Sequence, residues 1–346
     1  MSEKTNKIIL GAIGGIAAFT ALFALKRRRR FNFEDKVVLI TGGSRGLGLV
    51  LARRFAELGA RIAICARDAE ELGRARMDLE GRGAEVLDIV CDVQNQNDVK
   101  RMISEVNSRF GSIDVLVNNA GVIQVGPLEA QTQQDFEEAM AIHFWGPFYT
   151  MQEVIPAMRK RSEGRIVNIS SIGGKIPVPH LAPYCASKFA LSGLSAAMHT
   201  ELAQDNISVT TVYPGLMRTG SHINAKFKGQ NNKEFALFSL SDATPLTSIG
   251  VERAAAKIIQ ACADGDAELV ITVQAKLAAK LYALAPELTL GLLGLTNRFL
   301  PDNGGIGIES ATGLQSTSEL SPSFLTGLID QAAVDNNELK PNEHIN

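Results

Sequence analysis

Short apolar runs alternate with amphipathic segments through the middle of this chain of 346 residues. Three segments repeat their apolar positions with the spacing of a helix, at residues 49–58, 184–194 and 251–263. Between them, compact apolar runs have the length and composition of buried strands: residues 37–40, 61–65, 85–91, 113–117, 166–169, 207–213 and 268–273. The alternation predicts one large α/β domain over residues 31–273.

A longer apolar stretch precedes this domain at residues 8–25, where 18 consecutive residues carry no charge. As a helix it would be about 27 Å long, close to the hydrocarbon thickness of a bilayer. A basic block at residues 26–30 follows at once, whereas a cleaved signal peptide carries its charges before the apolar core. The pattern predicts an uncleaved single-pass membrane anchor, residues 1–30 with its flank, and a cytoplasmic domain after it. The alternative is an apolar helix packed against the domain.

Two further segments follow the predicted domain. Residues 274–301 are strongly apolar, but Pro286 and Glu287 interrupt them, so a second membrane span is not expected. This segment would lie on the membrane surface, shield the substrate entrance, or pack between subunits. Residues 302–346 are rich in Gly, Ser, Thr, Asn and acidic residues, which is typical of a disordered or loosely attached tail.

Composition excludes several classes of protein. An apolar content of 45% excludes a fibrous or mainly disordered chain. The formal net charge is only −2, but the charges are unevenly distributed: residues 1–30 contain seven Lys/Arg, and residues 302–346 contain seven Asp/Glu. The bilayer explains the basic cluster, and no nucleic-acid motif is present. The four cysteines form no CxxC pair and have no clustered His ligands, so neither a metal site nor a disulfide framework is expected.

A glycine-rich turn joins the first predicted strand to the first predicted helix. Its sequence, TGGSRGLG at residues 41–48, places glycines at Gly42, Gly46 and Gly48. These glycines let the backbone turn tightly and approach a pyrophosphate, whose charge is favoured by a helix N-terminus. A position directly after a strand, opening a helix, is the context expected of a dinucleotide site.

The end of the second predicted strand indicates which dinucleotide binds. A unit that binds NAD has an acidic residue there, which would repel a 2′-phosphate. Here the strand ends in Arg67, and Arg45 lies in the glycine turn, so two guanidinium groups can hold the extra phosphate of NADP(H). The alternative is that Arg67 is a solvated residue partnered by Asp68.

Polar residues also follow the third and fourth predicted strands. Asp92, followed by Val93, is placed to reach the adenine amino group. The fourth strand ends in Asn118-Asn119, whose side chains can tie adjacent strand ends together beside a nucleotide, although asparagines are also common turn formers.

Three polar side chains follow the later strand at residues 166–169. Ser171 comes at the end of this strand, and Tyr184 and Lys188 lie one turn apart on the next helix. A tyrosine titrates near pKa ~10, and a lysine beside it would favour the phenolate and bring that pKa closer to working pH. Ser171 would hold the oxygen whose proton Tyr184 delivers or removes. The trio suits interconversion of an alcohol and a carbonyl, whereas the pair alone is also compatible with simple packing.

With TGxxxGxG at residues 41–48, NNAG at residues 118–121, and Ser171, Tyr184 and Lys188 in this order, the chain resembles the short-chain dehydrogenase/reductase family over residues 33–272. The resemblance implies a single-domain Rossmann fold, a doubly wound parallel sheet of about seven strands, and hydride transfer involving nicotinamide. It also implies that Tyr184 is the acid/base, that Lys188 binds the nicotinamide ribose and assists Tyr184, and that Ser171 orients the substrate oxygen.

The motifs together predict a set of cofactor-binding residues. Pro214, Gly215 and Thr219 resemble the family's PGxxxT, in which the threonine and the backbone before it would fix the carboxamide of nicotinamide. The complete set predicted to bind NADP(H) is Gly42, Ser44, Arg45, Gly46, Leu47, Gly48, Arg67, Asp92, Val93, Asn119, Ala120, Gly121, Tyr184, Lys188, Pro214, Gly215 and Thr219.

One residue departs from the family pattern. The family has an asparagine in the long helix after the fourth strand, where it supports a water in the proton relay to the lysine, and this chain has His143 in that place. Two interpretations stay open. His143 replaces the asparagine in the catalytic set through a ring nitrogen, or it caps a kink in the helix.

The segment at residues 216–249 has irregular periodicity, and the resemblance implies a substrate lid there. Its apolar residues would line a substrate pocket or close the core beneath the lid: Met217, Phe227, Phe235, Leu237, Phe238 and Leu240. Lys226, Lys228 and Lys233 add charge. An apolar pocket on a membrane-tethered enzyme suggests a small lipophilic carbonyl or alcohol as substrate.

The leading hypothesis is an NADPH-dependent carbonyl reductase, or the reverse alcohol dehydrogenase, anchored in a membrane. The alternative is a membrane-tethered NADP(H)-binding scaffold or sensor that has lost efficient catalysis, which among the sequence features only His143 favours. A homodimer and a homotetramer are both left open by the sequence.

Overall fold

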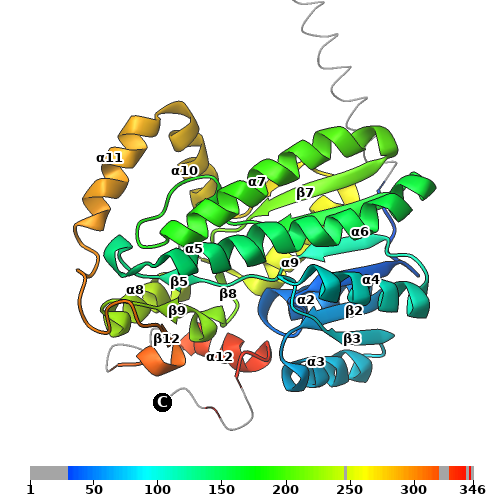
Figure 1. The fold of residues 1–346 in the computed structure, drawn as a ribbon, viewed down its shortest axis with the longest axis horizontal. Coiled ribbons are helices and arrows are strands. Elements are labelled where there is room, and N and C mark those ends of the chain that lie inside the picture. The colour runs from blue at the N-terminus through cyan, green and yellow to red at the C-terminus, as the bar shows by residue number, and fades with distance from the viewer. Residues whose placement is uncertain (1–29, 245–247, 319–326, 340–342, 344–346) are drawn as a thin grey trace, which may run out of the picture.

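The computed structural model describes residues 30–244, 248–318, 327–339 and 343. Figure 1 shows a central sheet with helices on both sides. Within these ranges no helix combines the length and the apolar character needed to cross a bilayer. The predicted anchor at residues 8–25 lies outside the described residues.

The central sheet contains seven strands in the order β11-β7-β6-β4-β1-β2-β3, and every pair is parallel. The predicted α/β Rossmann fold with a seven-stranded parallel sheet is therefore confirmed. The strands are β1 (Val37–Thr41), β2 (Arg61–Ala66), β3 (Val86–Val90), β4 (Val115–Asn118), β6 (Gly164–Ile169), β7 (Ile207–Tyr213) and β11 (Glu268–Val270). Strand order reverses between β1 and β4, and ligands of such sheets bind at the carboxyl ends of the strands beside the reversal.

Helices bury both faces of this sheet, which explains why its strands are continuous apolar runs. In β1 the side chains of Val38 and Ile40 join the core on one face, and those of Val37 and Leu39 join the core on the other. The first face is covered by α2 (Gly46–Glu57), α3 (Ala69–Gly81) and α9 (Val251–Asp264). The second is covered by α4 (Gln96–Phe110), α6 (Gly146–Arg161) and α7 (Ala182–Leu202).

The predicted lid contains α8 (Asn231–Ala243) and short strands in two small sheets. Its strands are β8 (Leu216–Arg218), β9 (Lys226–Phe227) and the start of β10 (Ser248–Gly250). β9 pairs with β5 (Gln124–Val125) and β12 (Ala311–Thr312), which lie outside the predicted lid. Phe227 and Phe235 are buried together with Val125 in a separate apolar cluster. These two aromatics therefore close a small core beneath the lid, as the second interpretation of the sequence had it.

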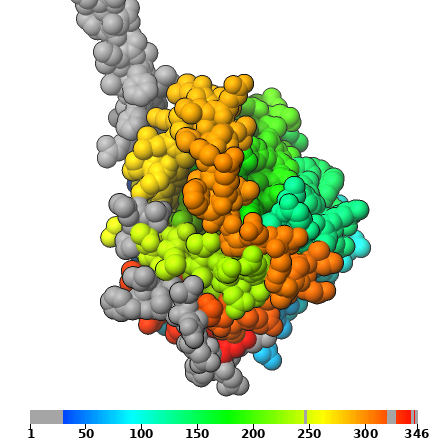
Figure 2. Space-filling model, turned by 90° about the vertical axis from the view of Figure 1, so that its left-hand side faces the viewer, coloured from blue at the N-terminus to red at the C-terminus, as the bar shows by residue number. Residues whose placement is uncertain are grey.

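A helical hairpin follows β11. It consists of α10 (Val273–Leu284) and α11 (Pro286–Asn297), and the chain breaks at the proline that the sequence analysis singled out. Only Ala275 and Thr289 are buried within the two helices, while the leucines are largely exposed. Figure 2 shows the hairpin, in gold and orange, on the surface of the molecule.

The described parts of the segment after the hairpin differ from the loosely attached tail that its composition predicts; residues 319–326, 340–342 and 344–346 lie outside the described residues. β12 pairs with β9, and α12 (Gly327–Asp335) packs on α8 with Ile329 and Ala333 buried. These few apolar side chains anchor an otherwise polar segment. The residues that follow, up to Glu338, return to the glycine-rich turn near the start of the chain.

Candidate active site

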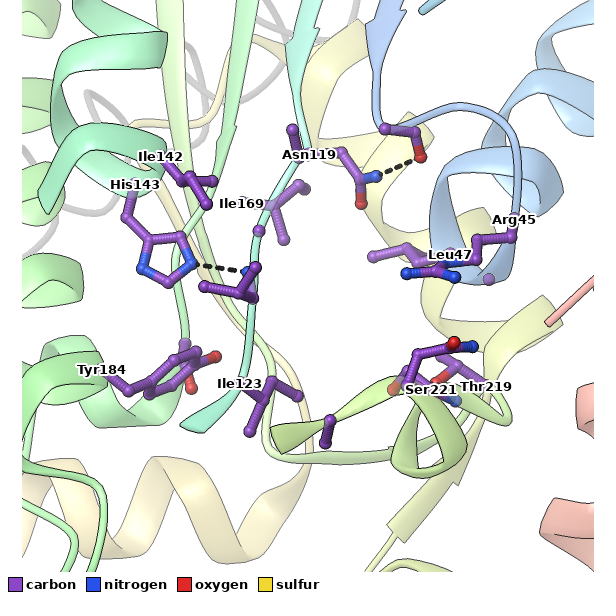
Figure 3. Close-up of a pocket in the computed structure, with 18 of the residues that line it drawn as sticks. Arg45, Leu47, Asn119, Ile123, Ile142, His143, Ile169, Tyr184, Thr219 and Ser221 are labelled. Carbon is purple, nitrogen blue, oxygen red and sulfur yellow. Dashed lines mark hydrogen bonds between the residues drawn. The ribbon is translucent and has the colours of Figure 1, made fainter. Parts of the chain in front are cut away.

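A cavity of about 630 Å³ opens at the carboxyl ends of β1, β4 and β6, beside the reversal of strand order. Figure 3 shows His143 and Tyr184 on one side of it and Arg45 and Leu47 on the other. The structure brings the whole predicted set to this cavity except Gly48. Gly48 lies within α2, where a Cβ atom would come 2.0 Å from the carbonyl oxygen of Gly42. It therefore serves the close packing of the turn on the helix.

The glycine-rich turn is built from conformations that favour glycine. Gly42 and Gly46 have φ angles of +63° and +53°, which side chains with a Cβ atom rarely adopt. The backbone of Gly46 opens the N-terminus of α2 toward the cavity, so its N–H groups and the helix dipole favour an anion there. The turn fits the pyrophosphate of a dinucleotide.

Asparagine side chains fasten the strand ends beneath this turn. Asn119 Nδ2 donates to the carbonyl oxygens of Thr41 (3.1 Å) and Gly42 (2.9 Å). Asn118 is buried, and its Nδ2 donates to Asn168 Oδ1 at 2.8 Å. The two asparagines thus join β1, β4 and β6 at the edge that carries the cavity, which is one of the two roles that the sequence left open.

Ser171, Tyr184 and Lys188 meet at the other end of the cavity. β6 ends just before Ser171, whose side chain is hydrogen-bonded to that of Tyr184. Lys188, one turn along α7, is buried, and its Nζ lies 5.6 Å from the centroid of the Tyr184 ring. Nζ donates a hydrogen bond to the carbonyl oxygen of Ile169 at 2.8 Å, which fixes the ammonium behind the phenol.

The electrostatics of this trio differ from the expectation. Burial raises the pKa of Tyr184 to about 12, although the hydrogen bond with Ser171 lowers it in part. Burial also lowers the pKa of Lys188 to about 7, so this group carries only part of a positive charge at neutral pH. In this state burial is the largest effect on the pKa of the phenol. Tyr184 is therefore protonated at neutral pH, which is the form that donates a proton.

His143 lies in a π-helical turn, η2 (Ala141–Trp145), where the chain passes from α5 (Gln133–Met140) into α6. Its Nε2 accepts a hydrogen bond from the backbone N–H of Val122 at 3.1 Å, so Nδ1 carries the proton and donates to Ser187 Oγ at 2.7 Å. Burial, and then the charge of Lys188, hold the pKa of His143 well below its usual value. Both ring nitrogens of a neutral imidazole are thus used to join the loop after β4 to α7.

These contacts give His143 a positioning role, and its titration provides a test. Because the folded protein keeps the imidazole neutral while the unfolded chain protonates it near pH 6.5, the free energy of unfolding should fall as pH drops below that value. The contribution is about 1.4 kcal/mol for each pH unit. Urea unfolding at pH 7.5 and 5.5 should show this loss in the wild-type protein and a smaller loss in His143→Asn. The positioning role would be contradicted if the free energy of unfolding fell equally in both proteins. It would also be contradicted if the pH dependence of kcat lost its acidic or its basic side in the variant.

The two predicted ligands of the 2′-phosphate differ in their present contacts. Arg67 is exposed, lines the cavity, and has no ion pair within the described part of the chain. Arg45 instead contacts Glu71 at 3.2 Å and Glu338 at 3.4 Å. Asp68 caps the N-terminus of α3 by accepting from the N–H groups of Glu70 and Glu71. Arg67 is therefore the guanidinium group available to a ligand without the loss of a salt bridge.

The C-terminal segment places a carboxyl group at the glycine-rich turn. A Cβ atom built on Gly46 would lie 2.5 Å from Glu338 Oε1, and no other group comes within 4 Å of it. The carbonyl oxygen of Asn336 accepts from the N–H of Gly46 at 2.9 Å, and Asn224 Nδ2 donates to Glu338 Oε2 at 2.7 Å. An acidic side chain thus occupies a position that favours an anion.

We expect Glu338 to compete with phosphate groups for this position. Burial raises its pKa to about 7, so the carboxyl is mostly ionised at pH 8 and mostly neutral at pH 6. The wild-type protein should bind NADPH more weakly at pH 8 than at pH 6. At pH 8 Glu338→Gln should bind NADPH several-fold more tightly than the wild type, and its affinity should differ little between the two pH values. Fluorescence titration of the full chain measures both values, with the exposed Glu309→Gln as control. Weaker binding by Glu338→Gln would mean that the carboxyl helps to hold the cofactor.

The cavity residues that sequence reasoning missed include two acids, Glu338 and Asp242. Neither belongs to a motif, and each reaches the cavity only through the packing of α12 and α8. The apolar lining was also overestimated, because only Met217 and Phe238 of the six predicted lid residues line the cavity. Lys226 lines it as well, and is paired with Glu138.

Comparison with known proteins agrees with this geometry. The model of the short chain dehydrogenase family matches residues 36–228. A putative ketoacyl reductase of granaticin polyketide synthase from Streptomyces violaceoruber is 35% identical over 245 residues, which are 69% of this chain and 90% of the relative. A dehydrogenase/reductase SDR family protein 7-like from Anopheles gambiae is 32% identical over 282 residues, 80% of this chain and 87% of the relative.

A solved structure of actinorhodin polyketide ketoreductase with NADPH aligns with a TM-score of 0.61 and 31% identity. The alignment covers 68% of this chain and 95% of that structure. The matched family region contains the glycine-rich turn, Ser171, Tyr184 and Lys188 within one continuous span. The chain therefore belongs to the short-chain dehydrogenase/reductase family of oxidoreductases.

Proposed function

We propose that this oxidoreductase uses NADPH to reduce the carbonyl group of a small lipophilic substrate to an alcohol. The observation that carries the proposal is the position of Tyr184 at the cavity wall, together with Ser171 and with Lys188 behind it; burial keeps the phenol protonated. A phenol in this form is a general acid, which is what a carbonyl oxygen needs as it gains negative charge.

The residues of the cavity have different roles in the proposed reaction. Ser171 and Tyr184 donate hydrogen bonds to the substrate oxygen, and Tyr184 passes its proton to that oxygen as the alcohol forms. Bound NADPH would supply the hydride to the carbonyl carbon. Lys188 binds the nicotinamide ribose and stabilises the phenolate that remains, because its ammonium is fixed by Ile169 close to the ring.

The proposed preference for NADP(H) depends on charge at the end of β2. This strand is followed by Arg67, and both Arg67 and Arg45, in the glycine-rich turn, line the cavity. A similar ketoreductase has been solved in a crystal structure with NADPH, which supports the same choice. Asp92 and Val93 would contact the adenine, and Pro214, Gly215 and Thr219 would contact the nicotinamide; all five residues line the cavity.

The lipophilic substrate and the membrane location are proposed together. Apolar side chains of Val178, Leu181, Met217 and Phe238 line the cavity beside Tyr184. The uncharged stretch at residues 8–25 and its basic flank favour a single-pass anchor with the catalytic domain on the cytoplasmic side. Extraction of membranes with alkaline carbonate would test the anchor, since the full chain should stay in the membrane and a chain lacking residues 1–30 should not.

A screen of carbonyl compounds tests the activity. Consumption of NADPH and of NADH would be followed by absorbance with retinoid, steroid, fatty acyl and sphingoid carbonyls. We expect turnover with NADPH for at least one class. Tight NADPH binding without turnover of any carbonyl or alcohol would instead favour a cofactor-binding scaffold, and a clear preference for NADH would overturn the assigned roles of Arg45 and Arg67.

A further inference from the structure

Asp242 is a buried carboxyl group in the cavity that the proposed proton transfer does not use. It lies near the end of α8, is 5% exposed, and lines the cavity together with Tyr184. Phe238 lines the same cavity one helical turn earlier, so both side chains lie on the helix face that is turned toward the substrate.

Asp242 differs from the other buried acids near the cavity in having no partner. Glu234 is paired with His180 at 2.6 Å, Asp135 is paired with Lys228, and Glu338 accepts from Asn224. Among the described residues, none donates a hydrogen bond to Asp242 or forms an ion pair with it, and burial alone accounts for the shift of its pKa to about 8. Buried polar groups are nearly always hydrogen-bonded, so a carboxyl without a partner that faces a cavity indicates a missing ligand.

The chemistry of this carboxyl limits what it can bind. Since it is mostly protonated at neutral pH, it can donate one hydrogen bond and accept another, and it attracts cations only weakly. The apolar side chains of Val178, Leu181 and Phe238 line the same cavity. A hydroxyl or carbonyl oxygen suits such a group best. Asp242 and Tyr184 line the same cavity, and a charge on Asp242 raises the pKa of Tyr184.

We propose that Asp242 binds a second oxygen of the substrate, so that the enzyme prefers ketones carrying a hydroxyl or a further carbonyl to equally large hydrocarbon ketones. The inference rests on the proposed carbonyl reduction and adds the substrate class to it. Asp242 would thus select among substrates by their second oxygen, while apolar side chains such as Phe238 contact the rest of the molecule.

A pair of cyclic ketones tests the preference. The probes are 4-hydroxycyclohexanone and 4-methylcyclohexanone, which have nearly the same size and differ in one oxygen. With NADPH, the wild-type protein should show kcat/KM about tenfold or more higher for the hydroxyl compound. Asp242→Leu should reduce that ratio to about one or below, whereas Asp242→Asn, which keeps a donor and an acceptor, should retain most of it.

Controls separate this inference from other causes. Ser241→Ala, at the exposed neighbouring position on α8, should leave the ratio unchanged. NADPH titration and thermal unfolding identify a variant that is merely misfolded, and Asp242→Ala, which also removes both oxygens, then replaces Asp242→Leu in the test. The role of Asp242 is overturned if the wild-type protein reduces both compounds with similar kcat/KM, or if Asp242→Leu leaves the ratio of the two kcat/KM values unchanged. The proposed reduction stands in either case. A preference for 4-aminocyclohexanone that is lost in Asp242→Asn would overturn it in favour of a cation. Failure of every carbonyl in the wider screen counts against the proposed function itself.

Discussion

Replacing Tyr184 with phenylalanine should lower kcat for carbonyl reduction by about 10²–10⁴-fold, which is the usual contribution of a positioned general acid. The variant keeps the aromatic ring, whose centroid lies 5.4 Å from that of His143 in an edge-to-face contact. It loses only the hydroxyl that interacts with Ser171. The affinity for NADPH should therefore stay nearly the same. Single-turnover absorbance measures the chemical step, and fluorescence titration measures the affinity.

A matched tyrosine controls for general effects of the substitution. Tyr149 is on α6, stacks on Trp145 and does not line the cavity, so Tyr149→Phe should leave kcat nearly unchanged. If Tyr184→Phe kept its kcat within about tenfold of wild type, Tyr184 would not be the proton donor. If both kcat and NADPH affinity collapsed together, the loss would be structural and Lys188→Met would be the next variant to measure.

Replacing Arg67 with alanine should raise the KM for NADPH by about 10–100-fold and leave the KM for NADH nearly unchanged. A hydrogen bond between charged groups contributes about 1.5–3 kcal/mol, and about 1.4 kcal/mol corresponds to a tenfold change in affinity. Arg67 is the better choice for this test than Arg45, because removal of Arg45 also leaves Glu71 and Glu338 without their cation. Initial rates with each cofactor at a fixed substrate concentration give both constants.

An arginine outside the cavity provides the control for Arg67. Arg76 lies on α3, is paired with Asp88 at 3.4 Å and does not line the cavity, so Arg76→Ala should change neither constant. Equal losses with NADPH and NADH would mean that Arg67 contacts a group common to the two cofactors. The extra phosphate would then have to be bound by Arg45 or not at all.

The parts of the site that could be predicted from the sequence are those determined by neighbours along the chain. The glycines of the turn are needed for backbone angles of that turn, and the Tyr184 to Lys188 spacing is a property of one helix. Strand ends can be placed with similar success, because a buried parallel sheet requires apolar runs that end where polar residues begin.

The parts that could not be predicted depend on contacts between distant segments. Asp242 and Glu338 enter the cavity only because α8 and α12 pack where they do. The pKa of Tyr184 follows from burial, which local spacing does not report. For His143 the sequence offered two interpretations, and neither of them includes the hydrogen bonds to Val122 and Ser187 that take up both ring nitrogens.

Because the C-terminal segment returns to the glycine-rich turn, the part of the chain that forms the cavity extends beyond the family domain. The family region closes at residue 228, yet part of the cofactor cavity is made by Glu338, with Asn336 and Asn337 bonded to the turn beside it. Shortening the chain to its recognisable domain would remove a wall of the site rather than a dispensable appendage. For this protein, the borders of the family domain and the borders of the catalytic module are different.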